Sequence, residues 1–255
     1  MKAGRLTLAA ALALAVAPAA ALAGPLHHVA GSVSKGFPNG GTLVGGRRWS
    51  NTKWARQRTG RAGSWGIPQM IQLLQSSAHK VAQRFPRSVL MIGDISAKNG
   101  GPLPGHNSHQ SGRDADVGFY MHDASKRPVV SDAFLAFDAQ GNAVGDKRLH
   151  FDDARNWELV ATWLGDGRVE VRGIFIAGWL KARLLKRAEE VHAPKTLIER
   201  AQMVMMQPPN AEPHHDHFHL RIACPPSQKG VCFDDSIDRT PHAPSGISAP
   251  SGDGG

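Results

Sequence analysis

Between Ile67 and Phe85 the apolar residues recur at intervals of three and four, the spacing of one face of a helix. Pro68 stands at the start of this stretch, where the first turn of a helix tolerates proline. The pattern predicts a helix over residues 67–85, which faces the core through Ile67, Met70, Ile71, Leu74, Ala78, Val81 and Phe85.

Two later segments show the same helical spacing. Apolar residues recur over 157–164, and the carboxylate of Asp152 or Asp153 would cap a helix that begins there. A third helix is predicted over 177–192. It must end before Pro194, because the residue that precedes a proline disfavours helical backbone.

Strands are predicted where short apolar or alternating segments are bounded by turn residues. The segment at 88–96, "SVLMIGDIS", resembles a buried strand, and a Gly/Pro loop runs from it to Gly112. A second strand, "DADVGFYM", follows at 114–121, and a third, "RVEVRGIFI", at 168–176.

The order of these elements defines the fold class. Strands and helices mix without a regular βαβ repeat, which favours an α+β fold over a doubly wound sheet. We expect a single domain with a central, mainly antiparallel sheet flanked by helices and a site in a cleft on the sheet. Residues 24–66 are rich in Gly, Arg and Trp without sustained periodicity, so we expect irregular chain draped over the domain.

Two of the strands have one apolar and one polar face, since alternate side chains of a strand point the same way. One is the strand at 114–121. The other is the segment "HHDHFHLRIA" at 214–223. The polar faces carry Asp114, Asp116 and Gly118 in the first strand and His215, His217, His219 and Arg221 in the second.

The two ends of the chain differ from the middle. Residues 1–23 have a basic start, an apolar run and a small-x-small ending at Ala21-Leu22-Ala23, which predicts a secretory signal peptide. Residues 240–255 are too small and polar to pack, so we expect a disordered tail after a domain over 24–239. No later segment is apolar for long enough to span a bilayer, so we expect an exported protein that is not membrane-spanning.

The formal net charge of +9 indicates an anionic partner, although Lys2 and Arg5 lie within the predicted signal peptide. Nucleic acid, anionic lipid and a carboxylate-rich cell wall all satisfy this criterion. Charge alone does not choose among them.

The two cysteines, Cys224 and Cys232, are close in sequence and both survive signal removal. In an oxidising compartment such a pair most simply forms a disulfide that closes a small loop. Their spacing excludes a CxxC redox or metal site. The bridge would begin five residues after His219 and would fix the end of the strand that carries it.

The histidines and aspartates of the polar faces admit several interpretations. A single histidine is most often a surface residue, and histidine tracts also bind metals loosely without catalysis. Imidazole and carboxylate groups that face each other in the protein interior need an interaction partner, and a divalent cation is such a partner. Imidazole with carboxylate is a usual ligand set of zinc, which favours a catalytic zinc site.

The segments "HNSHQSGRDADV" and "HFHLRIAC" together resemble the penicillin-insensitive murein endopeptidases. These belong to a wider group with the lysostaphin-type enzymes, the D-Ala-D-Ala metallopeptidases and the amino domain of sonic hedgehog. The group's signature is a histidine, a glycine three positions on and an aspartate seven on, later joined by His-x-His. His109, Gly112 and Asp116 match the first part, and His217 and His219 match the second.

The resemblance implies that Zn²⁺ is bound by His109, Asp116 and His219. His106 matches a further histidine of the murein endopeptidase subgroup, one that can occupy the open zinc position in a resting enzyme. Zinc would polarise the scissile carbonyl and lower the pKa of water towards neutrality.

The resemblance also implies catalytic histidines beside the metal. His217 would be the main catalytic imidazole, as base or as donor to the oxyanion, and His214 matches another active-site histidine of the subgroup. His215 has no match and is interpreted as a bystander. Asp114 is either a residue that orients a ligand or a solvent-facing strand residue, with equal weight.

Some family members have a second metal site built from an aspartate and a histidine after the central strand. His150 is the candidate counterpart here. The position three before it holds Lys147 rather than aspartate, which argues against a second metal.

By the same resemblance, the substrate is cross-linked peptidoglycan, cut between D-alanine and meso-diaminopimelate in the periplasm, and nucleic acid is not the partner. Three alternatives remain: a D,D- or L,D-carboxypeptidase on the same site, a binding module that holds zinc without hydrolysis, and a metal chaperone. The chaperone would bind several metals weakly, whereas the hydrolase needs one tight site.

Overall fold

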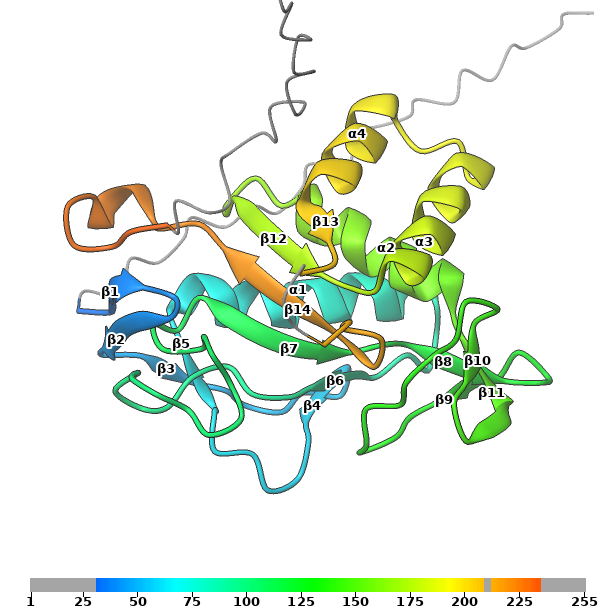
Figure 1. Ribbon diagram of the computed structural model, residues 1–255, viewed down its shortest axis with the longest axis horizontal. Helices are drawn as coiled ribbons and strands as arrows, with labels where there is room; N and C mark the ends of the chain where they lie inside the picture. Colours follow the sequence, from blue (N-terminus) through cyan, green and yellow to red (C-terminus); the bar gives the residue numbers. More distant parts are fainter. Residues whose placement is uncertain (1–30, 209–211, 235–255) are drawn as a thin grey trace, which may run out of the picture.

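The computed structural model describes residues 31–208 and 212–234 (Figure 1). The predicted signal peptide at 1–23 and the predicted tail at 240–255 lie outside these residues. Among the described helices, none combines the length and the apolar character needed to cross a bilayer.

The central sheet has six strands, with antiparallel pairing in its middle and a parallel pair at each edge. Its order is β13–β12–β14–β7–β6–β4. The strands are β13 (Met205–Met206), β12 (Val171–Phe175), β14 (His217–Ile222), β7 (Asp114–Gly118), β6 (Leu90–Ile92) and β4 (Ala55–Gln57). The α+β prediction with a mainly antiparallel sheet is therefore confirmed.

Four helices pack on one face of this sheet, with α1 passing behind β7 and β14 in Figure 1. They are α1 (Pro68–Arg84), α2 (Asp153–Leu164), α3 (Gly178–Glu190) and α4 (Lys195–Val204), followed late in the chain by a short 3-10 turn, η1 (Pro226–Gln228). The helices cover the predicted apolar face: Phe218 is fully buried, and its ring meets that of Trp163 at 5.5 Å. The polar face of β7 and β14 is left for the site.

The first three helices lie where the apolar spacing predicts them. Asp152 caps α2, because its side chain accepts a hydrogen bond from Arg155 N at 3.0 Å. Helix α3 ends at Glu190, and α4, which the sequence did not predict, begins immediately after Pro194.

A second, four-stranded sheet has the order β10–β11–β8–β9. Its strands are β10 (Asn142–Ala143), β11 (Asp146–Phe151), β8 (Met121–Asp123) and β9 (Pro128–Val129). The strand predicted over 114–121 is confirmed for Asp114–Gly118 and wrong beyond it, since Met121 begins a strand of another sheet. The Asn156 side chain holds the break, because it accepts from Tyr120 N at 2.9 Å and donates to Tyr120 O at 2.8 Å.

The prediction of irregular chain over 24–66 is wrong for the described part. This region forms a hairpin and a second short pair in addition to β4: β1 (Val33–Phe37) with β2 (Gly40–Val44), and β3 (Arg47–Arg48) with β5 (Trp65–Gly66). The hairpin depends on glycine: a Cβ at Gly41 would lie 2.3 Å from Lys35 O and 2.4 Å from Phe37 O. Because glycine has no side chain, these glycine-rich strands lack the alternation of apolar and polar side chains from which a strand is predicted.

The predicted disulfide joins Cys224 to Cys232, with their Cα atoms 5.7 Å apart. The buried Arg113 guanidinium ties the same region to the hairpin. It donates to Ser34 Oγ at 3.0 Å, to Ile222 O at 3.1 Å and to Phe233 O at 2.8 Å. The end of β14 is therefore held by both a covalent bridge and a hydrogen-bonded cation.

Candidate metal centre

The antiparallel register of β14 and β7 brings the two polar faces together. His219 stands directly opposite Asp116, Arg221 opposite Asp114, and His217 opposite Gly118. Side chains directly opposite each other in an antiparallel pair have their Cβ atoms about 4.5–5.5 Å apart. The register alone therefore places an imidazole beside a carboxylate.

The loop between β6 and β7 adds two further imidazoles from His106 and His109. His109 has a backbone φ of 66°, a left-handed conformation that residues with a side chain seldom adopt. Strained conformations of this kind concentrate at functional sites, where the surrounding structure holds them. The full burial of His109 shows how tightly this position is enclosed.

Three atoms form a nearly equilateral triangle at the centre. His109 Nε2 lies 3.2 Å from Asp116 Oδ1, His219 Nδ1 lies 3.3 Å from Asp116 Oδ1, and the two nitrogens lie 3.3 Å apart. Ligand atoms bound to zinc at about 2.0–2.1 Å in a tetrahedron lie about 3.3–3.4 Å apart. The spacing matches one face of such a tetrahedron.

The outward nitrogens of these two rings are already bonded. His109 Nδ1 lies 2.8 Å from Ile95 O, which only accepts, so this nitrogen donates and Nε2 offers its lone pair inward. His219 Nε2 lies 3.1 Å from Asp114 Oδ1, which leaves Nδ1 inward in the same way. Backbone and carboxylate partners of this kind are typical of metal-binding histidines.

Asp114 is a buried partner in this arrangement rather than a solvent-facing residue. Its carboxylate also accepts from Arg221 Nε at 2.7 Å. Burial alone would raise the pKa of Asp114, but the Arg221 guanidinium and His219 outweigh it and hold this pKa far below its usual range. Asp114 therefore stays anionic.

Asp116 Oδ1 is the atom on which the rings converge. The nearest nitrogens of His109, His217 and His219 lie 3.2, 3.4 and 3.3 Å from it, yet it has no hydrogen-bond partner among the described residues. Burial opposes its ionisation, but the neighbouring imidazoles, His109 first, hold the pKa of Asp116 well below its usual range. A buried anion surrounded by ring nitrogens without hydrogen-bond geometry fits a cation-binding site.

His106 lies at the edge of this cluster. Its Nε2 is 3.1 Å from Asp94 Oδ2, and its Nδ1 is 3.6 Å from Asp116 Oδ2. Ligand atoms of His106, His109 and Asp116 lie within 4.8 Å of one another, so these residues could hold a metal ion.

Two further imidazoles stand beside the triangle. His217 Nδ1 lies 2.6 Å from Asp216 Oδ1. Burial lowers the pKa of His217, but its contacts with Asp116 and Asp216 outweigh burial and raise this pKa to about 9. For His214, burial and the nearby His219 and His217 lower the pKa to about 4, and its buried Nδ1 has no hydrogen-bond partner among the described residues.

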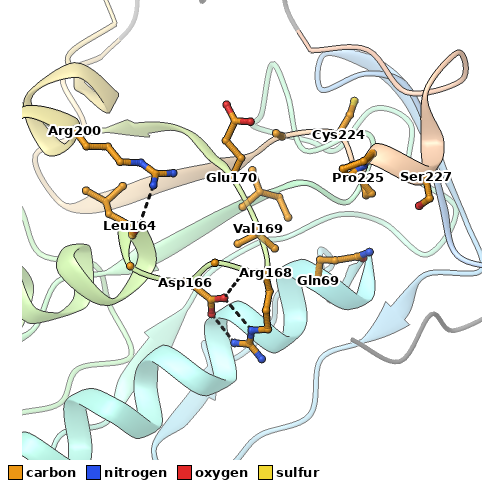
Figure 2. Close-up of a pocket in the computed structure, with 15 residues that line it drawn as sticks. Gln69, Leu164, Asp166, Arg168, Val169, Glu170, Arg200, Cys224, Pro225 and Ser227 are labelled. Carbon is orange, nitrogen blue, oxygen red and sulfur yellow. Dashed lines mark hydrogen bonds and ion pairs between the residues drawn. The ribbon is translucent and has the colours of Figure 1, made fainter. Parts of the chain in front are cut away.

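These groups line a cleft of about 530 Å³ on the polar face of the sheet, together with Asn39, His106, Asn107, Phe175, Glu212 and Arg221. A larger cavity of about 730 Å³ lies between α4 and the disulfide loop (Figure 2). Its charged groups already have partners: Arg168 Nε donates to Asp166 Oδ1 at 2.8 Å, and Arg200 donates to Leu164 O at 3.1 Å. The smaller cleft is the one lined by the clustered histidines and Asp116, so it is the candidate site.

His215 and His150, which the sequence analysis considered, lie outside this cluster. His215 precedes β14, where the strand alternation does not apply, and its Nδ1 lies 2.6 Å from Pro213 O beside Trp179. His150 lies on β11 in the second sheet, where its ring is 5.4 Å from that of His122.

Sequence reasoning did not identify Asp94, Asp216 or Phe134, which contact the site histidines. Asp94 directly follows a buried strand, and Asp216 lies next to His217. These positions are the features of the sequence that could have identified the two residues. Phe134 stacks on His217, with ring centroids 5.2 Å apart. No local pattern marks it, because it comes from the loop between β9 and β10.

Comparison with known proteins shows what this chain is similar to. The family model described as penicillin-insensitive murein endopeptidase matches residues 30–242. A protein of Haemophilus influenzae named penicillin-insensitive murein endopeptidase is 28% identical over 172 residues. This alignment covers 66% of the chain and 54% of the relative, so the chain spans about half the length of that protein.

Proposed function

Because the chain belongs to the penicillin-insensitive murein endopeptidase family, we propose that it is a zinc-dependent endopeptidase that hydrolyses D-alanyl–meso-diaminopimelyl cross-links in peptidoglycan. One observation carries the proposal. His109 Nε2, His219 Nδ1 and Asp116 Oδ1 form a triangle with sides of 3.2–3.3 Å, and spare imidazoles stand next to it in the same cleft.

His109, Asp116 and His219 would hold the zinc, and His106, at the edge of the cluster, would occupy the remaining position only in a resting enzyme. Three protein ligands leave one position open, as catalytic zinc requires. Zinc in such a set supplies Lewis acidity towards a peptide carbonyl and lowers the pKa of water towards neutrality. Asp116 is the one anion in the triangle, so the occupied site keeps a net positive charge.

His217 would move the proton. Its Nδ1 faces Asp216, and its Nε2 faces the cluster, 3.4 Å from Asp116 Oδ1. The pKa of His217 is raised partly by Asp116, whose charge a bound zinc would neutralise, so a neutral Nε2 could then take a proton from the attacking water and return it to the leaving amine. His214 has a free Nδ1 in the same cleft and would stabilise charge on the substrate oxygen or assist the transfer.

The partner is proposed to be cross-linked peptidoglycan in the periplasm rather than nucleic acid. The chain has 30 Lys and Arg against 21 Asp and Glu, which suits a polymer rich in carboxylates. The disulfide between Cys224 and Cys232 fits an oxidising compartment. A mechanism without a serine nucleophile accounts for insensitivity to penicillin, which acylates serine.

The test is digestion of purified, cross-linked peptidoglycan by the protein, with and without a chelator, and with penicillin as a second control. Mass spectrometry should show dimeric muropeptides converted to monomers, with the reaction stopped by chelator and unaffected by penicillin. Loss of only a terminal D-alanine would make the protein a carboxypeptidase. No product from protein that keeps a tightly bound zinc would make it a binding module.

A further inference from the structure

We propose that Phe134 and Asp216 are positioning residues that hold the His217 ring with its Nε2 towards Asp116. The inference rests on the proposed function, because it assigns to these two residues the orientation of the proposed catalytic imidazole. It is carried by the packing around that ring.

The first observation is a position on the polar face of the sheet that has no side chain. The polar face of β7 and β14 has three cross-strand pairs, and in the third His217 stands opposite Gly118, which has no side chain. A Cβ at Gly118 would lie 2.7 Å from Phe134 Cε1, and one at Gly93 would lie 3.0 Å from Phe134 Cε2. The two glycines form a slot for the Phe134 ring.

The second observation is the stack that fills this slot. The rings of Phe134 and His217 are 5.2 Å apart between centroids and only 22° from parallel. The Arg58 guanidinium lies over the Phe134 ring, with Cζ 4.3 Å from its centroid. Stacking of this kind fixes the plane of an imidazole that a strand residue would otherwise rotate about χ1 and χ2.

The loop that carries Phe134 is itself anchored. Arg58 Nε donates to Asp132 O at 2.6 Å, and Thr59 N donates to Asp132 Oδ1 at 3.0 Å. On the other side, Phe137 N donates to His215 O at 2.8 Å. The loop is thus tied both to the segment after β4 and to the histidine segment before β14.

The third observation is the hydrogen bond at the edge of the ring. Asp216 Oδ1 lies 2.6 Å from His217 Nδ1. A carboxylate oxygen only accepts, so Nδ1 carries the hydrogen and Nε2 is left as the nitrogen that exchanges a proton. Phe134 fixes the plane of the ring, and Asp216 fixes which nitrogen faces inward.

The experiment compares Phe134→Leu, Phe134→Tyr and Asp216→Ala with the unchanged protein, all loaded with zinc and assayed on a soluble cross-linked muropeptide. Two matched controls are Phe233→Leu, a half-exposed ring that packs on Phe37, and Asp146→Ala, a partly buried carboxylate paired with Arg148. Zinc per chain and the melting temperature are measured for each.

Misplacement of a reacting group lowers the rate more than it weakens substrate binding, so we expect kcat to fall about 10–100-fold in Phe134→Leu and Asp216→Ala. KM and zinc content should change little. Phe134→Tyr keeps the ring and should restore most of kcat. If both variants keep the kcat of the controls, or lose activity only together with zinc, the positioning role is wrong.

A readout that needs no activity is the ¹⁵N NMR spectrum of histidine-labelled protein. In the unchanged protein, measured above the pKa of His217 where the ring is neutral, the His217 resonances should show hydrogen on Nδ1, and Asp216→Ala should shift them towards the Nε2–H form. An unchanged spectrum would remove Asp216 from the proposal. Failure of the unchanged protein to cleave any muropeptide would instead refute the proposed function, whatever the spectrum shows.

Discussion

Within the part of the chain that the structure describes, histidines gather both beside the strand pair β7 and β14 and on the strand pair β8 and β11, and the two places differ in what the ring nitrogens contact. At the first, His217 and His219 of β14 and His109 of the loop before β7 direct ring nitrogens to one buried oxygen of Asp116 at 3.2–3.4 Å. On β8 and β11, the rings of His122 and His150 lie 5.4 Å apart.

Three of the four ring nitrogens of the second pair have other partners. His122 Nδ1 lies 2.7 Å from Asp123 O, and its Nε2 lies 3.2 Å from Lys126 Nζ. His150 Nδ1 lies 3.1 Å from Asn142 Oδ1. The Lys126 ammonium offers only hydrogens and repels a cation. A metal site is therefore distinguished by inward donor atoms without partners, and not by the number of histidines.

The largest effect expected from this comparison is the loss of metal in Asp116→Ala. The variant lacks the one anion of the triangle, so the remaining rings cannot neutralise zinc, and both metal and activity should be lost. His150→Ala, in the second pair, should keep its full zinc content. Zinc per chain after dialysis, measured by mass spectrometry, tests both. A full complement of zinc in Asp116→Ala would mean that the ligands are assigned wrongly.

The next effect separates catalysis from metal binding. His217→Ala should keep its zinc, because His109, Asp116 and His219 remain, while cleavage falls about 10²–10⁴-fold with the loss of a general base. His122→Ala is the matched change in the second pair and should cleave normally. Steady-state rates on a cross-linked muropeptide, with zinc content measured on the same samples, test this. Retained activity would remove His217 from the catalytic role.

A smaller effect is expected when a residue that hydrogen-bonds a proposed ligand, rather than the metal, is changed. Asp114→Asn weakens the acceptor that orients His219 and pairs with Arg221. Loss of such a partner typically costs about 10–100-fold in metal affinity. Asp123→Asn, next to His122, should leave the affinity unchanged. Competition with a fluorescent zinc chelator measures both variants, and equal affinities would show that Asp114 has no orienting role.

The same comparison shows what the sequence was able to predict. Strand alternation placed Asp114 and Asp116 on one face and His217 and His219 on another, and the antiparallel register then joined them. The resemblance to a known signature named the ligand set. Alternation was misleading only for His215, because β14 begins two residues later.

What sequence reasoning missed depends on contacts between distant segments. Phe134 reaches His217 because Gly93 and Gly118 leave space for its ring. No periodic pattern in the sequence near Phe134 indicates this contact. The break after Gly118 depends on Asn156, which bonds Tyr120 from 36 positions away. The hairpin of β1 and β2 is paired through its backbone at glycine-rich positions, where the apolar pattern is weak.

The smallest effect expected concerns how firmly β14, the strand that carries His219, is held. Removal of the bridge by Cys224→Ser with Cys232→Ser should lower the free energy of unfolding by about 2–3 kcal/mol, the loop-closure term for a ring of this size. Zinc content and cleavage should persist, because Arg113 still bonds Ile222 O and Phe233 O at the end of β14. Urea denaturation measures the first quantity, and chelator competition measures the second. A tenfold loss of zinc affinity would show that the bridge, rather than Arg113, sets the position of His219.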